Sequence, residues 1–258
     1  MFKKTLLSAC MVLGLGNAGF ASESGEIHDV AFSFEGVFGK FDQHQLQRGL
    51  QVYTEICSSC HGLNLVAYRN LGDAGGPDME EAQVKAYAAQ FEAFDPELDD
   101  YRPAIPSDYF ADGNDENAPD LSLMAKARKG FEGPNGLVIN PLFRGLGGPE
   151  YIVAILTGYT GEEKEQAGTI LYENTAFPGG WISMPQPLFD EMVEFEPAHE
   201  NDLHELSMDV AAFLMWTAEP KLMERKNAGL VAVLFLTFLA VMLYLTNKKI
   251  WAKAKRKD

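Results

Sequence analysis

A single pentapeptide, Cys-Ser-Ser-Cys-His at residues 57–61, constrains the fold of this chain more than any other feature. The pattern C-x-x-C-H is that of covalent haem attachment. Cys57 and Cys60 fall on one side of a helical turn, so each thiol can add to one vinyl group of the same porphyrin. His61 follows directly and can reach under the ring to ligate the iron. We therefore expect the chain to fold around one covalently bound haem c.

Two other interpretations of the motif are a redox disulfide and a zinc site. A C-x-x-C redox pair does not need the histidine that follows here. A structural zinc site needs four nitrogen or sulfur ligands at suitable spacing. The chain has three cysteines in all, and the third is Cys10, far from the motif near the N-terminus. The sequence therefore favours haem over both.

The N-terminus has the pattern of a secretory signal. Lys3 and Lys4 precede an apolar stretch at 6–15, and small residues follow up to Ala21. This stretch is too short to span a membrane. A segment ending at Cys10 resembles a bacterial lipoprotein cleavage box, but cleavage there would leave an apolar region below the ~7 residues that a signal needs. We expect residues 1–21 to be removed as a signal peptide.

The C-terminus has the pattern of a membrane anchor. Residues 228–246 carry no charge, and at ~1.5 Å per residue they span roughly 28 Å, about one hydrocarbon core. Six basic residues follow: Lys248, Lys249, Lys253, Lys255, Arg256 and Lys257. Basic flanks stay in the cytoplasm. The sequence thus predicts a transmembrane helix at 228–246, a cytoplasmic tail at 247–258 and an exported domain at 22–227.

The exported domain is strongly acidic. It keeps 13 of the 21 basic residues and 36 of the 37 acidic ones, a net charge of −23. That sign disfavours nucleic-acid binding. It would attract a positively charged partner, and it also favours solubility.

Two segments have the apolar periodicity of amphipathic helices, 42–56 and 202–219. Pro220 fits the end of the second segment, and Gly49 in the first permits close approach of another helix. The apolar positions are Leu46, Leu50, Tyr53 and Ile56 in the first segment and Leu206, Val210, Phe213 and Leu214 in the second. Crossed first and last helices resemble the class I cytochrome c fold. We expect a mostly α-helical, class I cytochrome c-like haem domain with a large insertion, plus one C-terminal transmembrane helix.

A second axial ligand would separate an electron carrier from a haem that binds small molecules. Met184 is our candidate, because it lies in a loop rich in Gly and Pro at 177–187 that can bring its sulfur to the iron. Met79 and Met192 are alternatives, and Met124, Met208 and Met215 fit core packing better. The other candidates are histidines: His28, His44, His199 and His204.

Several segments together resemble the cytochrome c1 family. They are 48–53 with the haem motif, 118–122 with 127–128, 156–159, 177–187, 216–220 and the anchor. The resemblance implies that His61 and Met184 ligate the iron and that Arg128 lies near a haem propionate. It also implies that Pro119 lies on the proximal side of the haem, where its carbonyl could accept the Nδ1–H of His61.

The resemblance also implies a place in a larger assembly. The chain would be the redox subunit of a dimeric quinol–cytochrome c oxidoreductase and no enzyme on its own. Its partners would be cytochrome b, the Rieske iron–sulfur protein as electron donor and a soluble or membrane-anchored cytochrome c as acceptor. Signal and anchor imply a bacterial inner membrane with the haem domain in the periplasm. Two other functions stay open: a tethered cytochrome that feeds a terminal oxidase, and a haem enzyme or gas sensor with an open sixth position.

Residues 73–120 are predicted to form an insertion. They contain fourteen acidic residues against Lys85 and Arg102. The insertion is either a docking surface for a basic cytochrome or a solvated excursion that packs on neighbouring subunits.

Overall fold

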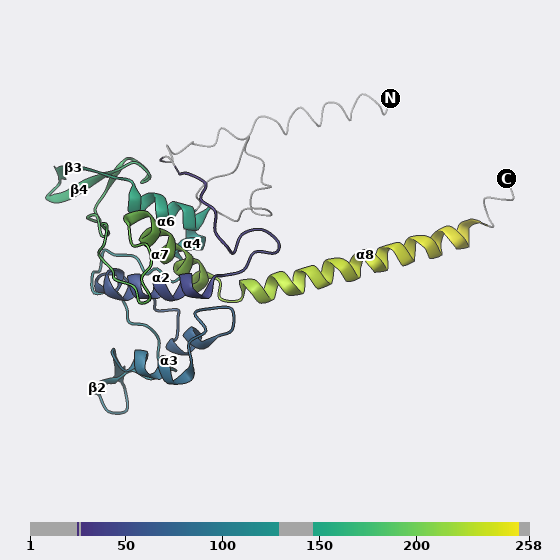
Figure 1. Cartoon of the computed structure of the whole chain (residues 1–258), viewed down its shortest axis with the longest axis horizontal. Helices are drawn as coiled ribbons and strands as arrows, with labels where there is room; N and C mark the ends of the chain where they lie inside the picture. The colour runs from purple at the N-terminus through teal and green to yellow at the C-terminus, as the bar shows by residue number, and fades with distance from the viewer. Residues whose placement is uncertain (1–24, 26, 129–146, 253–258) are drawn as a thin grey trace, which may run out of the picture.

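The structure is a computed structural model that describes residues 25, 27–128 and 147–252. Within these residues the chain is mostly helical, and one long helix projects from a folded domain (Figure 1). The α-helices are α2 (Gln43–Glu55), α3 (Glu81–Ala88), α4 (Met124–Ala127), α6 (Gly148–Thr157), α7 (Leu203–Ala218) and α8 (Leu222–Ala252). The 3₁₀ helices are η1 (Cys57–Ser59) and η2 (Tyr68–Gly72), and the strands are β1 (Glu92–Asp95), β2 (Asp100–Pro103), β3 (Tyr159–Gln166), β4 (Thr169–Asn174) and β5 (Trp181–Ile182).

Helices α2 and α7 form the centre of the domain, as the sequence predicts. Each begins at an aspartate: the Asp42 carboxylate accepts from Gln45 N at 3.0 Å, and Asp202 accepts from Glu205 N at 2.9 Å. The helices approach so closely at Gly49 that a Cβ there would lie 2.1 Å from Asp209 O. A glycine is therefore required at this crossing.

A buried ion pair also joins α2 to α7. Arg48 Nε donates to Asp209 Oδ2 at 2.7 Å, and Nη2 donates to Oδ1 at 2.9 Å. The Asp209 side chain is fully buried, and burial raises the pKa of this carboxyl although Arg48 opposes the shift. The bidentate contact compensates a charge that would otherwise be costly to bury.

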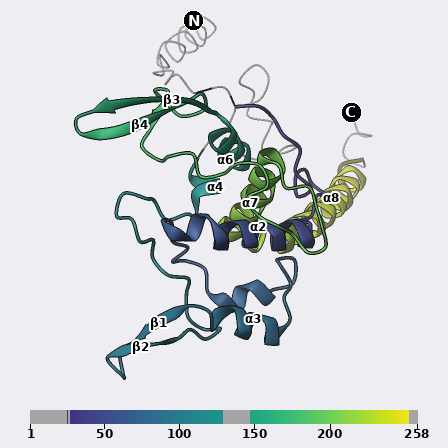
Figure 2. The ribbon, with the colours of Figure 1, turned by 60° about the vertical axis from the view of Figure 1, so that its left-hand side comes forward.

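The acidic insertion is folded. Figure 2 shows α3 and the β1–β2 hairpin on one side of α2, opposite α6 and the β3–β4 hairpin. Its inner face contributes Val84, Ala88, Ala104 and Phe110 to the core. Phe110 lies against Tyr68 of η2, with ring centroids 4.4 Å apart. The insertion is thus anchored by apolar packing while its charges face outward.

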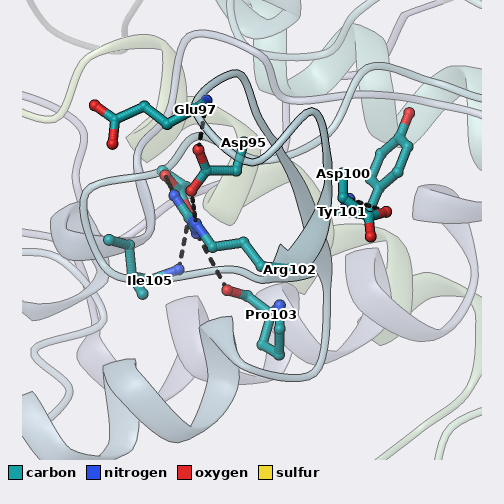
Figure 3. Close-up of polar contacts among 8 residues, drawn as sticks. Asp95, Glu97, Asp100, Tyr101, Arg102, Pro103 and Ile105 are labelled. Carbon is teal, nitrogen blue, oxygen red and sulfur yellow. Dashed lines mark hydrogen bonds and ion pairs between the residues drawn. The ribbon is translucent and has the colours of Figure 1, made fainter.

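An arginine-centred cluster fixes the β1–β2 hairpin (Figure 3). Arg102 Nε donates to Asp95 at 2.8 Å, and Nη1 donates to Asp108 at 2.6 Å. The Asp95 carboxylate also accepts from Glu97 N, and that of Asp108 accepts from Ile105 N, both at 2.9 Å. Hydrogen bonds from Arg102 lower the pKa of both aspartates. One of the two basic residues of the insertion is therefore engaged in holding its own loop together.

Helix α8 includes the predicted span but is longer. It begins at Leu222 and extends to Ala252. Among the described residues it is the one helix that is long and apolar enough to cross a membrane. Its 31 residues correspond to about 46 Å at ~1.5 Å per residue. The helix thus starts before 228 and continues into the predicted tail. The predicted signal peptide at 1–21 and the last basic residues, from Lys253 on, lie outside the described residues.

Candidate functional site: a haem attachment motif and its supports

The haem motif follows α2 directly and closes in a tight turn. Residues Cys57–Ser59 form η1, and His61 N donates to Cys57 O at 2.9 Å. Cys57 is half-buried, Cys60 is exposed, and both carry free thiols. Burial, with Cys60 as a second cause, raises the pKa of the Cys57 thiol to about 12. Redox-active C-x-x-C pairs have a lowered thiol pKa, so this direction argues against the redox interpretation.

His61 is held in one orientation by a backbone carbonyl. Its Nδ1 lies 2.7 Å from Pro119 O. Because a carbonyl only accepts, Nδ1 must carry the proton, and Nε2 keeps its lone pair for a metal. Tyr53 Oη donates to His61 O at 3.0 Å and fixes the backbone of the same residue. The structure thus brings together His61 and Pro119, which are 58 residues apart in the sequence.

Two glycines let the segment that carries Pro119 pass close to the motif. A Cβ on Gly62 would lie 2.6 Å from Gly113 N, and a Cβ on Gly113 would lie 2.2 Å from Cys60 O. Real Cβ atoms do not approach backbone so closely, so side chains here would push the two segments apart. The contact explains why glycine follows the motif.

Asp120 and Ser122 hold the same segment from the other side, although neither was among the predicted site residues. The Asp120 carboxylate accepts from Asn64 N at 2.8 Å and from Ser122 N at 2.9 Å. The Ser122 hydroxyl accepts from Leu65 N at 3.1 Å. An Asp-Leu-Ser sequence is a common turn signal, but its partners Asn64 and Leu65, 56 and 57 residues away, are visible only in the fold.

The Met184 loop is restrained by sheet pairing and by a tyrosine. Strand β5, two residues before Met184, pairs with β4. Tyr159 Oη donates to Met184 O at 3.0 Å and approaches Pro185 O at 3.5 Å. Gly180 at φ 76° permits the turn that leads into β5. These contacts restrain the position of the Met184 loop.

Arg128 lies at the C-terminal end of α4. Its backbone N–H donates to Met124 O at 3.2 Å, and its side chain is exposed. Burial raises the pKa of the half-buried Tyr151 of α6, and the positive charge of Arg128 opposes that shift. An exposed guanidinium at a helix end is available for a carboxylate such as a haem propionate.

The residues of the motif fit a haem. Two unbridged thiols stand at the required spacing beside an imidazole whose orientation is fixed. Outer partners that orient a ligating histidine are a regular feature of metal sites. The geometry therefore matches covalent attachment with one axial nitrogen ligand.

Comparison with known proteins agrees with this geometry. The model of the cytochrome C1 family matches residues 32–254. The chain belongs to the cytochrome c1 family. Cytochrome c1 of Cereibacter sphaeroides is 50% identical over the whole chain and 98% of that protein. The mitochondrial cytochrome c1 heme protein of Kluyveromyces lactis is 36% identical over 87% of this chain and 76% of its own length.

A fused relative is also informative. The protein of Bradyrhizobium diazoefficiens named cytochrome b/c1 is 41% identical over 86% of this chain, which spans 35% of that protein. Family membership confirms the resemblance, the mostly α-helical haem domain and the covalently bound haem c. The chain is accordingly a membrane-anchored, haem-bearing electron-transfer protein.

Proposed function

We propose that the chain passes single electrons from a Rieske iron–sulfur protein to a c-type cytochrome, as the cytochrome c1 subunit of a quinol–cytochrome c reductase. The observation that carries this proposal is the 2.7 Å contact of His61 Nδ1 with Pro119 O beside two free thiols. A haem attached to these thiols would have one axial ligand of fixed orientation, as an electron carrier needs.

Each predicted site residue has a distinct role in this proposal. Cys57 and Cys60 would hold the porphyrin through thioethers, and His61 and Met184 would ligate the iron. Arg128 would pair with a propionate. When bound, the haem supplies one-electron exchange between ferric and ferrous iron, and a histidine–methionine pair raises its potential. Tyr159 holds the backbone of Met184 so that its thioether stays in place.

The partners follow from the family and from charge. The relative named cytochrome b/c1 supports a partnership with cytochrome b. The acidic exported domain suits a basic electron acceptor. Quinol oxidation would belong to the assembly, which we propose to be dimeric, and this chain alone would not be an enzyme.

The proposed location is a bacterial inner membrane. Residues 1–21 would be removed as a signal peptide, and α8 would cross the membrane at 228–246. The haem domain, residues 22–227, would then lie in the periplasm and the basic tail, 247–258, in the cytoplasm. Accessibility of engineered cysteines on either side of intact membrane vesicles measures this orientation.

Replacement of Met184 by Leu tests the axial ligand. The change removes the thioether at nearly constant volume, so the reduction potential should fall and the reduced protein should bind carbon monoxide. Met192→Leu is the matched control, because Met192 is the alternative methionine in the same region and is half-exposed. If the reduction potential and optical spectrum change in Met192→Leu and not in Met184→Leu, Met192 is the axial ligand and the proposal for Met184 is wrong.

Co-purification tests the assembly. A tagged chain extracted in mild detergent should carry with it a b-type haem and a Rieske protein. A preparation that lacks both and still reduces a terminal oxidase would favour the tethered cytochrome described above.

A further inference from the structure

A short loop before α2 lies beside the first turns of α8. We call residues 34–39 the 34–39 loop. The Lys226 ammonium of α8 donates to the backbone oxygen of Phe34 and, at 3.2 Å, to that of Gly39. Both ends of the loop are therefore fastened to the same helix. Figure 1 shows the purple segment that contains the loop on the side of the domain from which α8 projects.

The apolar side chains of this segment divide into two groups. Phe34 is buried and packs against Phe32 and Phe41, with ring centroids 5.0 Å and 4.9 Å away. Val37 and Phe38, at the tip of the loop, are 45% and 80% exposed. No other large hydrophobic side chain in the described part of the chain is as exposed as Phe38. The base of the loop is thus anchored in the core, and two apolar side chains are left outside it.

The backbone of the loop is closed and its polar groups have partners. Lys40 N donates to Ser33 O at 2.9 Å across the base of the loop. A Cβ on Gly39 would collide with Glu35 O, so the close approach of the two strands of the loop requires glycine. The ammonium of Lys226 satisfies two further carbonyls. Backbone groups with partners can approach lipid at little cost, whereas unpaired ones cannot.

The attachment point on α8 sets the height of the loop relative to the membrane. Lys226 lies two residues, or ~3 Å, before the uncharged stretch 228–246 begins. A loop of this length can extend at most about 10 Å from its base. Apolar side chains of segments that lie on a membrane insert by ~5–10 Å into the boundary between headgroups and acyl chains. Phe38 is therefore within reach of that boundary.

The distribution of charge around the tip suits a phospholipid surface. Residues 36–39 carry no charge. Glu35 is the acidic residue of the loop, but it is half-buried and its carboxylate faces Glu150 of α6. Lys40 directly follows the loop and is exposed. Basic side chains at a membrane surface keep their charge among the headgroups while their aliphatic stems lie lower.

We propose that the 34–39 loop inserts Val37 and Phe38 into the membrane surface beside α8, as a second contact between the haem domain and the lipid. The side chains of α8 from Val231 on are exposed and apolar, so loop and helix offer the bilayer one continuous apolar surface. This continuity favours lipid over a protein as the occupant. The inference rests on the proposed function, in which α8 crosses the membrane at 228–246.

Site-directed spin labelling tests the insertion on the full chain with its haem, reconstituted in phosphatidylcholine vesicles together with the subunits that co-purify. Phe38→Cys provides the one reactive thiol, because the cysteines of the haem motif form thioethers when haem is attached and Cys10 lies in the predicted signal peptide. Power saturation then compares collisions of the label with oxygen, which concentrates in lipid, and with a water-soluble nickel chelate. A label in lipid has a high ratio of oxygen to nickel collisions.

Leu98→Cys is the matched control. Leu98 is an exposed apolar residue in the turn of the β1–β2 hairpin, which lies on the side of the domain away from α8 (Figures 1 and 2). The collision ratio at residue 38 should be severalfold higher than at residue 98. Val37→Cys should give the same result as Phe38→Cys, and it replaces that variant if Phe38→Cys does not fold.

Two results would overturn the proposal. A ratio at residue 38 no higher than at residue 98 would mean that the tip is in water. Few collisions with either reagent would mean that another protein covers the tip. Leu236→Cys, in the middle of the predicted span, separates this inference from the proposed function. A high ratio at residue 236 with a low one at residue 38 refutes the insertion alone, and low ratios at both refute the crossing of α8 and the insertion with it.

Discussion

The hydrogen bond from Tyr159 to the Met184 backbone makes a quantitative prediction about axial ligation. Tyr159→Phe removes the donor that lies 3.0 Å from Met184 O and 3.5 Å from Pro185 O, and keeps the ring. A neutral hydrogen bond of this kind contributes about 0.5–1.5 kcal/mol net. Met184 is half-buried, so water can partly replace the lost donor, and the lower half of that range applies. The population with the thioether detached should then rise by about two- to fivefold.

Carbon monoxide reports that population, because it binds reduced haem only when the sixth position is open. Its association rate with the reduced variant should rise by the same factor. Burial, followed by Tyr172, raises the pKa of Tyr159, so its hydroxyl stays a donor and the ratio of rates should be constant from pH 6 to 9. Tyr101→Phe, at an exposed hairpin tyrosine, is the control. An unchanged rate in Tyr159→Phe would refute the claim that this bond restrains the ligand.

Three further predictions concern the scaffold. Arg48→Met should lower the free energy of unfolding by about 3 kcal/mol, because it leaves the buried Asp209 carboxylate unpaired, and thermal unfolding measures this loss. Gly49→Ala should destabilise by about 1–3 kcal/mol in the same assay, since its Cβ would meet backbone at 2.1 Å; full stability would contradict the close crossing. Arg102→Gln should lower the thermal midpoint at pH 7. Because Arg102 depresses the pKa of Asp108, that stabilisation is present above about pH 4 and is lost as the pH falls through the lowered pKa, so the midpoints of parent and variant should converge in acid; a gap that widens would refute the assignment.

The sequence predicted the elements that depend on local pattern. Helices α2 and α7 were expected within a residue of their observed ends, because apolar periodicity and capping aspartates are local signals. Their contact at Gly49 was expected for a similar reason. The carbonyl of Pro119 as partner of His61 came from the family resemblance, and the structure shows the contact.

Features that depend on distant partners were not predicted. The restraint on Met184 comes from Tyr159, 25 residues earlier, and no local pattern indicates it. The fold of the acidic insertion was left open because its charges obscure the few apolar residues that anchor it. The start of α8 at Leu222 was missed because charged residues precede the apolar stretch, although they extend the helix.

The junction between domain and anchor has a consequence for how this chain exchanges electrons. Three residues separate α7 from α8. Glu219, one of the three, pairs with Lys126 of α4 at 3.1 Å and with Arg225 of α8 at 2.7 Å. A linker so short and so cross-connected gives the domain little freedom to swing about its anchor. The haem is thereby kept at a constant height above the lipid, and any travel needed to bring donor or acceptor within range has to be made by the partner.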